Sequence, residues 1–204
     1  MNIKPTRSEL IKLKRKIKLA KSGYNLLKKK RDGLILEFFE LLKETKSVRK
    51  EMTDKYKEAI RKINVARIVD GDLSIKSASM AVSKKPVIEV SNKNIMGVVV
   101  PSIKSENIKK SVMERGYGIV NTSAAITESS NAYEELLEYI ILVAEIETAI
   151  IRLLEEIDKT KRRVNALEFE VIPKMEKVKK FIQLRLEEQE RETIFRSKII
   201  KKKA

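Results

Sequence analysis

The side chains of this chain that could do chemistry are mainly carboxylates, and seven of the carboxylates occur in two clusters. They are Glu134, Glu135 and Glu138, and then Glu187, Glu188, Glu190 and Glu192. Carboxylate oxygens alone favour hard cations such as Ca²⁺ or Mg²⁺. The chain has no His and no Cys, which excludes imidazole acid–base chemistry, thiol nucleophiles and Cys/His zinc sites. We expect both clusters to be solvated helix faces, so we predict no catalytic, metal or cofactor-binding residues.

Glycine-rich phosphate loops are also missing. Neither GxxxxGK[ST] nor GxGxxG after a strand occurs in the sequence. The segment Arg115-Gly116-Tyr117-Gly118 is too short and badly placed for a nucleotide site, and Asp70-Gly71-Asp72 is expected to be a turn. We therefore expect a chain that is not itself an enzyme.

Basic residues outnumber acidic ones, and many of them crowd the N-terminal region. Lys and Arg total 45 against 29 Asp and Glu, for a formal net charge of +16. Such an excess implies an acidic protein surface, nucleic acid or an anionic membrane as partner. It is also compatible with a solvated face that keeps a long helix soluble. The crowded positions are Lys12, Lys14, Arg15, Lys16, Lys18, Lys21 and Lys28 to Arg31.

Two long amphipathic stretches must position these charges. Positions alternately three and four apart from Leu10 to Lys62 are apolar at twelve of sixteen places, and so are those from Tyr133 to Arg185. This spacing is typical of a coiled-coil seam. Each seam is too narrow to bury itself, so the two stretches are expected to pack against each other. The predicted fold class is all-α dominated: a long antiparallel two-helix coiled coil with a small central β-hairpin and short helical segments.

Residue numbers facing each other across the coiled coil should sum to about 195 to 200. Arg31 occupies a seam position, and at this register it would lie within about a turn of Glu168. We therefore predict that Arg31 and Glu168 form a buried or half-buried pair that sets the register. The alternative is that the Arg31 side chain extends out of the seam into solvent.

The chain divides into three predicted segments. Residues 1–64 form the first long helix, with Thr6 and Glu9 as a capping box at its start and Gly23 and Gly33 as sites of local bending. Residues 65–130 form a central cap, with a β-hairpin at about 87–100. Its strands are expected at 87–90 and 95–100, with a four-residue turn between them and Pro86 and Pro101 as its bounds. Residues 131–204 form the second long helix, which Pro173 should kink.

Two blocks of sequence resemble the D subunit of the archaeal A-type and vacuolar V-type rotary ATPases. The first is LKRKIKLAKSGYNLLKKKRDGLI, from Leu13 to Ile35, preceded by Pro5-Thr6-Arg7. The second is TKRRVNALE, from Thr160 to Glu168, followed by Ile172-Pro173 and LEEQERE. The blocks lie on both predicted helices, so the resemblance covers nearly the whole chain. Tyr24 and Gly33 depart from the residues usual in that family, which are His and Glu.

The resemblance implies a non-catalytic rotor shaft that transmits torque between a catalytic ring and a membrane ring. Its implied partners are the catalytic A and B subunits, the F subunit and the subunit that caps the membrane ring, without nucleic acid or direct membrane insertion. Its implied location is the cytoplasmic side of the cell membrane, as a peripheral part of the complex.

Partner contacts follow as expectations on the same basis. Contacts with the A/B hexamer are expected at Thr6, Arg7, Lys14, Arg15, Lys18, Arg185, Glu188 and Arg191. Contacts with the F subunit or the cap are expected at Val87, Ile88, Val90, Ile95 and Val98.

Two other functions fit a basic coiled coil. A prefoldin-like chaperone also pairs long helices across β-hairpins, but it predicts a shorter chain with apolar helix tips. A nucleic-acid-binding coiled coil would show steep salt dependence, and this chain lacks the aromatic residues common in single-strand binders. Co-purification with A, B and F subunits would separate the three functions.

Overall fold

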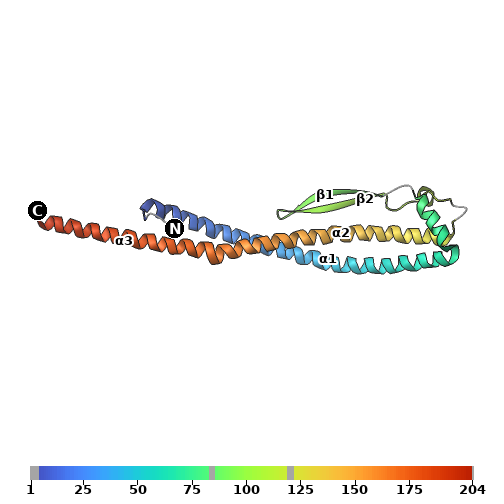
Figure 1. The fold of residues 1–204 in the computed structure, drawn as a ribbon, viewed down its shortest axis with the longest axis horizontal. Helices are drawn as coiled ribbons and strands as arrows, with labels where there is room; N and C mark the ends of the chain where they lie inside the picture. The colour runs from blue at the N-terminus through green and yellow to red at the C-terminus, as the bar shows by residue number, and fades with distance from the viewer. Residues whose placement is uncertain (1–4, 83–85, 119–121, 204) are drawn as a thin grey trace. The chain divides into compact units, whose positions relative to one another are not determined.

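The computed structural model describes residues 5–82, 86–118 and 122–203, and most of them are helical. The elements are α1 (Arg7–Ala81), β1 (Val87–Ile95), β2 (Val98–Glu106), the 3₁₀ turn η1 (Val112–Arg115), α2 (Ala124–Asn165), the π-helical segment η3 (Ala166–Val171) and α3 (Ile172–Lys203) (Figure 1). The predicted fold class, long helices plus one β-hairpin, is confirmed. The chain forms two compact units, described separately: the terminal unit, residues 1–33 with 157–204, and the central unit, residues 34–156.

In the terminal unit, the start of α1 runs antiparallel to α3. Thr6 caps α1 as predicted, because its Oγ1 accepts a hydrogen bond from the Glu9 amide at 3.2 Å. Ion pairs join Arg7 to Glu190 at 2.6 Å and Lys21 to Glu176 at 2.7 Å. The residue numbers of each pair sum to 197, within the predicted register. Ile17 and Ile182 are buried in this unit.

A π-helical turn precedes Pro173, where the sequence predicted a kink. In this turn the Ile172 amide bonds to the Leu167 carbonyl, five residues back. Proline lacks an N–H, and its ring would clash with the carbonyl four residues before it in a regular α-helix. A wider turn at this point accommodates the ring, so the proline changes the hydrogen-bonding pattern without ending the helix.

In the central unit, the remainder of α1 packs against α2. Ala59, Ala132 and Leu136 form a buried cluster. Lys55 Nζ lies 2.8 Å from Glu135 Oε2, and Arg49 pairs with Glu147 at 3.7 Å. The numbers of these two pairs sum to 190 and 196, so the helices of this unit are also antiparallel.

The predicted seams are confirmed for the first stretch and need a correction for the second. None of the sixteen seam positions from Leu10 to Lys62 is exposed. In α2 the series containing Leu136 and Val143 is inward as predicted, whereas Ile140 and Leu154 are exposed. The second buried series lies one residue earlier, at Ile146, Leu153 and Thr160. A core built on this second series avoids burying Glu147 and Lys161, so the less charged of the two possible faces of α2 packs inward.

The first helix does not end near residue 64, as predicted, but continues to Ala81 through an interruption at Gly71. Gly71 has φ 79° and ψ 159°, a conformation that essentially only glycine adopts. Ala66 and Ala78, on either side of it, pack in one buried cluster with Tyr117 and Ile126. This shared core explains why the chain stays helical beyond Gly71. Asp70 also accepts a hydrogen bond from the Ser123 hydroxyl just before α2.

The β-hairpin is present, but its turn lies later than predicted. β1 continues through the expected turn to Ile95, and Ile95 pairs with Val98 across a two-residue turn at Met96-Gly97. Both turn residues have positive φ, 50° and 86°, as a type I′ turn requires. The Asn94 side chain accepts the Gly97 N–H at 2.8 Å. Pro101 does not bound the hairpin but lies inside β2, opposite Asn92.

Candidate functional site

The predicted hexamer-binding residues all belong to the terminal unit, and all are exposed. Lys14, Arg15 and Lys18 form a basic run on the first turns of α1. Several of the other residues also have intramolecular partners: Thr6 caps α1 and Arg7 pairs with Glu190, while Arg185 pairs with Glu188 at 3.0 Å. The Arg185 guanidinium also lies over the Phe181 ring, 5.8 Å from its centroid. Lys14, Arg15, Lys18 and Arg191 are exposed basic positions with which a partner surface could interact.

The predicted register pair is not formed. Arg31 instead donates through Nε and Nη2 to Asp32, at 3.0 and 2.8 Å. Glu168 is exposed, on the π-helical segment. The ion pairs Arg7–Glu190 and Lys21–Glu176 link the two helices of this unit, and both lie on its surface.

The acidic clusters are not merely solvated. Glu134, Glu135 and Glu138 bind Arg115, Lys55 and Lys109, respectively. Glu188, Glu190 and Glu192 each pair with an arginine. Among the described residues, no group of three or more acidic side chains is arranged to hold a metal ion. The carboxylates therefore bind basic side chains of the same chain.

Hydrogen bonds from lysines lower the pKa values of Glu135 and Glu176. The hydrogen bond from Lys55, followed by its charge, lowers the pKa of Glu135, and the same interaction raises the pKa of Lys55. The hydrogen bond from Lys21 and its charge lower the pKa of Glu176. These pairs are exposed or half-exposed, so each contributes little stability alone.

A buried charged side chain, that of Arg115, lies between η1 and α2. The side chain of Arg115 is 3% exposed, and that of Glu134 is 19% exposed. Arg115 Nε donates to Glu134 Oε1 at 2.9 Å and Nη2 donates to Oε2 at 2.8 Å, a two-point ion pair. Arg115 also donates to the Asn131 side chain, the Tyr117 hydroxyl and the Thr127 carbonyl. Burial alone would lower the pKa of Arg115, but the interactions with Glu134 and Tyr117 outweigh it and raise the pKa.

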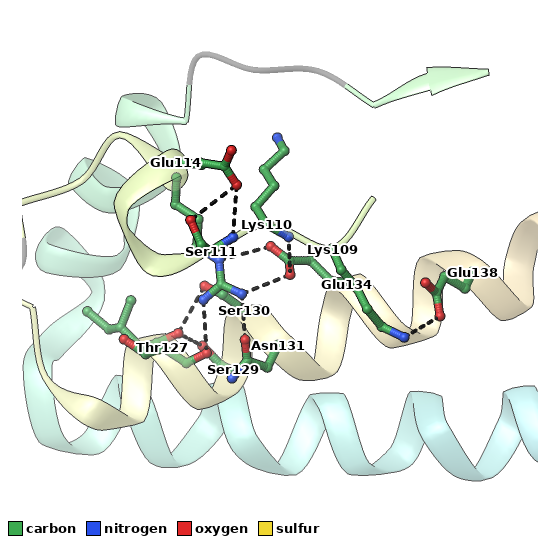
Figure 2. Close-up of polar contacts among 12 residues, drawn as sticks. Lys109, Lys110, Ser111, Glu114, Thr127, Ser129, Ser130, Asn131, Glu134 and Glu138 are labelled. Atoms are coloured by element: carbon green, nitrogen blue, oxygen red, sulfur yellow. Dashed lines mark hydrogen bonds and ion pairs between the residues drawn. The ribbon is translucent and has the colours of Figure 1, made fainter. Parts of the chain in front are cut away.

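This cluster fixes the segment between the hairpin and α2. Figure 2 shows Thr127, Asn131 and Glu134 on successive turns of α2, facing the segment that carries Lys109 to Ser111. Glu134 also accepts the Lys110 amide at 3.2 Å, and Lys109 pairs with Glu138 at 2.8 Å. The short turn η1 is stabilised by Glu114, whose side chain accepts hydrogen bonds from the Ser111 amide and hydroxyl. The resulting anchor holds the base of the hairpin against α2.

The hairpin itself contacts α2 through β2. Val98 and Val100 are buried. Arg152 donates to the Val99 carbonyl at 2.8 Å, and the Ile103 amide donates to Glu145 at 3.1 Å. β1 is exposed along almost its whole length. Of the predicted partner contacts, Val87, Ile88 and Val90 are therefore exposed and Ile95 is half-buried. Val98 is covered by its own chain, and its contact with a partner stays a prediction.

The residues that fix the hairpin were not predicted from the sequence; they are Arg115, Glu145 and Arg152. Arg115 was considered only as part of a possible nucleotide loop. The one available signal was its place beside Gly116, a left-handed residue (φ 84°) that ends η1 and turns the chain. Apart from Tyr117, the partners of Arg115 lie 12 to 19 residues away in the sequence, so spacing alone could not identify them.

No helix in the described part of the chain combines the length and apolar character needed to cross a membrane. Two exposed surfaces contain predicted contact residues: the basic run at the start of α1 and the strand β1.

Comparisons with known proteins give one consistent result. The sequence profile of a family described as the D subunit of ATP synthase matches residues 9–202. The D subunit of the A-type ATP synthase from Methanococcoides burtonii is 56% identical over 200 residues, covering 98% of this chain and 97% of that protein. Proteins of the same name from Methanoregula boonei and Methanosarcina acetivorans are each 54% identical over 200 residues, covering 98% of this chain and 96% of theirs.

Proposed function

The chain belongs to the family of ATP synthase D subunits, and on that premise we propose that it is the central rotor shaft of an A-type rotary ATP synthase. In this role it transmits torque between the catalytic A/B hexamer and the membrane ring, and it makes no covalent bonds itself. Family membership favours this function over a prefoldin-like chaperone and over a nucleic-acid-binding coiled coil.

The observation that best supports the proposal is the antiparallel helix pair of the terminal unit. Ion pairs at two levels, Arg7–Glu190 and Lys21–Glu176, join its helices, and Ile17 and Ile182 are buried. Torque on one helix is therefore resisted by contacts with the other. The π-helical turn before Pro173 allows the helix to continue where a proline would otherwise interrupt it.

The exposed basic run on α1 supports a contact with an acidic ring. Lys14, Arg15 and Lys18 are exposed on one helix of this pair. Exposed charge contacts are individually weak, about 0.2–1 kcal/mol, and they are screened by salt. Weak contacts suit a shaft that must change partners as it turns. The partners we propose are the catalytic A and B subunits around the terminal unit, and the F subunit and the membrane-ring cap subunit elsewhere on the chain.

The proposed location follows from the proposed complex. As a shaft between a soluble catalytic ring and a membrane ring, the chain would lie at the cytoplasmic side of the cell membrane, as a peripheral component.

Removal of the basic run together with Arg185 of α3 tests the proposal. In the assembled ATPase, the quadruple variant Lys14→Ala, Arg15→Ala, Lys18→Ala and Arg185→Ala should hydrolyse ATP with fewer ions pumped per ATP, because contacts that couple the ring to the shaft are lost. The measurement is ATP-driven rotation and ion pumping at equal ATPase rate. A control removes four exposed basic residues of the central unit: Lys43, Lys46, Lys50 and Arg61. Equal coupling in the test variant, the control and the parent protein would contradict the proposal.

A further inference from the structure

The two edges of the hairpin differ in how their backbone groups are satisfied. In an antiparallel pair, alternate residues exchange hydrogen bonds with the partner strand, and the others direct their N–H and C=O groups outward. Ile95 and Val98 flank the two-residue turn and form a bonded pair. Counting back from that pair, the outward groups belong to Val99, Pro101, Ile103 and Ser105 on β2, and to Ile88, Val90, Asn92 and Asn94 on β1.

Contacts with α2 confirm this assignment on the β2 side. The outward carbonyl of Val99 accepts from Arg152, and the outward amide of Ile103 donates to Glu145. Pro101, at the outward position between them, has no N–H to satisfy. The β2 edge is therefore covered by side chains of α2 and interrupted by a proline, two means by which proteins block further strand pairing.

The β1 edge has neither protection. In the described chain the sheet has only two strands, so no third strand pairs with β1. It has no proline over its nine residues. Its outward positions carry no charged side chain that would repel another strand. Ile88 and Val90 are 49% and 65% exposed.

The side chains of the same residues form an uncharged face. Residues with outward backbone groups share one face of the hairpin, because side chains alternate along a strand. That face holds Ile88, Val90, Asn92 and Asn94 with Val99, Pro101, Ile103 and Ser105, whereas Glu89, Lys93, Lys104 and Glu106 share the other. In a chain that is 36% charged, a face of eight residues would carry about three charges by composition. The β2 half of this face is partly covered by the chain itself, since Pro101 is buried and Ile103 half-buried. The part open to a partner is therefore the β1 side, where the exposed Ile88 and Val90 lie next to the open strand edge.

We propose that β1 accepts an added β-strand from a partner protein, an extended segment with apolar side chains at alternate positions that meet Ile88 and Val90. This mode of binding gains affinity from main-chain hydrogen bonds and specificity from alternate side chains. A second copy of this chain is disfavoured as the partner, because two chains of net charge +16 repel each other. The identity of the donor rests on the proposed function: the strand comes from another soluble component of the same rotary complex.

Amide hydrogen exchange tests the proposal directly. The full chain is compared alone and after mixing, in turn, with each of the other purified soluble subunits of the ATPase from the same organism. With the donor bound, exchange at Ile88, Val90 and Asn92 should slow at least tenfold. Exchange at Glu89, Ser91 and Lys93, whose amides already bond to β2, should change much less. A uniform change along β1, or none with any of these proteins, would overturn strand addition.

Proline variants give an independent readout. Val90→Pro removes one outward N–H without breaking a bond to β2, so the free chain should keep its helical circular dichroism and melting temperature while donor binding weakens at least tenfold. Val99→Pro is the matched control, because it removes an outward N–H from the covered edge of the same face. The proposal is wrong if Val90→Pro binds every one of these proteins as tightly as Val99→Pro does.

The outcome is separable from that of the proposed function. If strand addition fails but the rotor assignment holds, the Val90→Pro chain still assembles into the rotary complex and no β1 amide is protected there. If the rotor assignment fails, the unmodified chain binds none of the ATPase proteins. A concentration-dependent dimer in sedimentation, abolished by Val90→Pro, would overturn the proposal in favour of a second copy.

Discussion

Arg115 and Glu134 form a buried two-point ion pair that joins the segment after the hairpin to α2, with Nε–Oε1 and Nη2–Oε2 distances of 2.9 and 2.8 Å. Neither belongs to a seam. The pair holds the base of the hairpin in place, and through it the open edge of β1. Removing one partner of such a pair leaves the other charged and buried, which costs more than the intact pair contributes.

Glu134→Gln should therefore lower the free energy of unfolding by about 3 kcal/mol, because the Arg115 guanidinium loses its charged acceptor but stays buried. Urea denaturation followed by circular dichroism measures this change. Lys109→Ala, which removes the neighbouring but exposed Lys109–Glu138 pair, should cost less than about 1 kcal/mol. Equal losses in the two variants would show that burial does not distinguish the pairs.

Thr160 offers a stabilising substitution. Its side chain is buried, and among the described residues its Oγ1 has no hydrogen-bond partner. Thr160→Val replaces the hydroxyl by a methyl group of similar size and should raise the free energy of unfolding by about 1 kcal/mol. Thr148→Val is the control, since the exposed Thr148 hydroxyl bonds to the Ala144 carbonyl. Lower stability for Thr160→Val in chemical denaturation would indicate that the hydroxyl is satisfied in solution.

Gly23 and Gly71 should respond in opposite directions to alanine. A Cβ at Gly23 meets nothing within 4 Å, and the residue is helical, so Gly23→Ala should stabilise the protein by about 0.5–1 kcal/mol. Gly71→Ala should destabilise it by about 1–3 kcal/mol, because its φ of 79° and ψ of 159° strain any residue with a Cβ. Thermal melts of both variants give the comparison. A stabilised Gly71→Ala chain would mean that α1 is not interrupted there.

Stability should fall with acid. The pKa values of Glu135, Glu58 and Glu176 are all lowered by hydrogen bonds from lysines and by the lysine charges. A carboxylate whose folded-state pKa is lowered contributes its full stability above its unfolded pKa, and the contribution is lost as the pH falls through the folded value. The loss should therefore begin as the pH drops below about 4.5. Melting temperature against pH measures it.

Glu135→Gln should flatten that pH profile, because glutamine cannot titrate. The exposed Glu187 provides the control, and Glu187→Gln should leave the profile closer to that of the parent. If acid unfolds all three proteins along the same curve, the Lys55–Glu135 pair contributes no pH dependence.

Much of the helical architecture could be predicted from local pattern. Thr6 capped α1 as expected because a cap depends only on residues within one turn. The seam from Leu10 to Lys62 was confirmed because apolar spacing directly fixes which face of a helix is buried. In α2, half of the predicted seam was wrong by one residue. The predicted positions Ile140 and Leu154 and the observed positions Ile146 and Leu153 are all apolar, so only packing selects between the two series.

The hairpin and Arg31 show where local pattern is insufficient. The segment 91–94 and Met96-Gly97 are both plausible turns. The choice is decided by the burial of Val98 and Val100 and by the Asn94 side chain, which accepts a hydrogen bond from the Gly97 amide. Arg31 was predicted to pair with Glu168 and instead bonds to Asp32, one residue away, because the nearest acceptor requires the least ordering of a long side chain.

The amino-acid sequence by itself determined that two long amphipathic stretches would be helices and that a hairpin would lie between them, because these features depend on contacts a few residues apart. Only the tertiary structure decided that α1 runs past Gly71, that Arg115 meets Glu134, and that one edge of the hairpin is covered while the other stays open. These outcomes depend on groups brought together from distant positions, where many pairings are chemically possible and the burial of a shared core selects one.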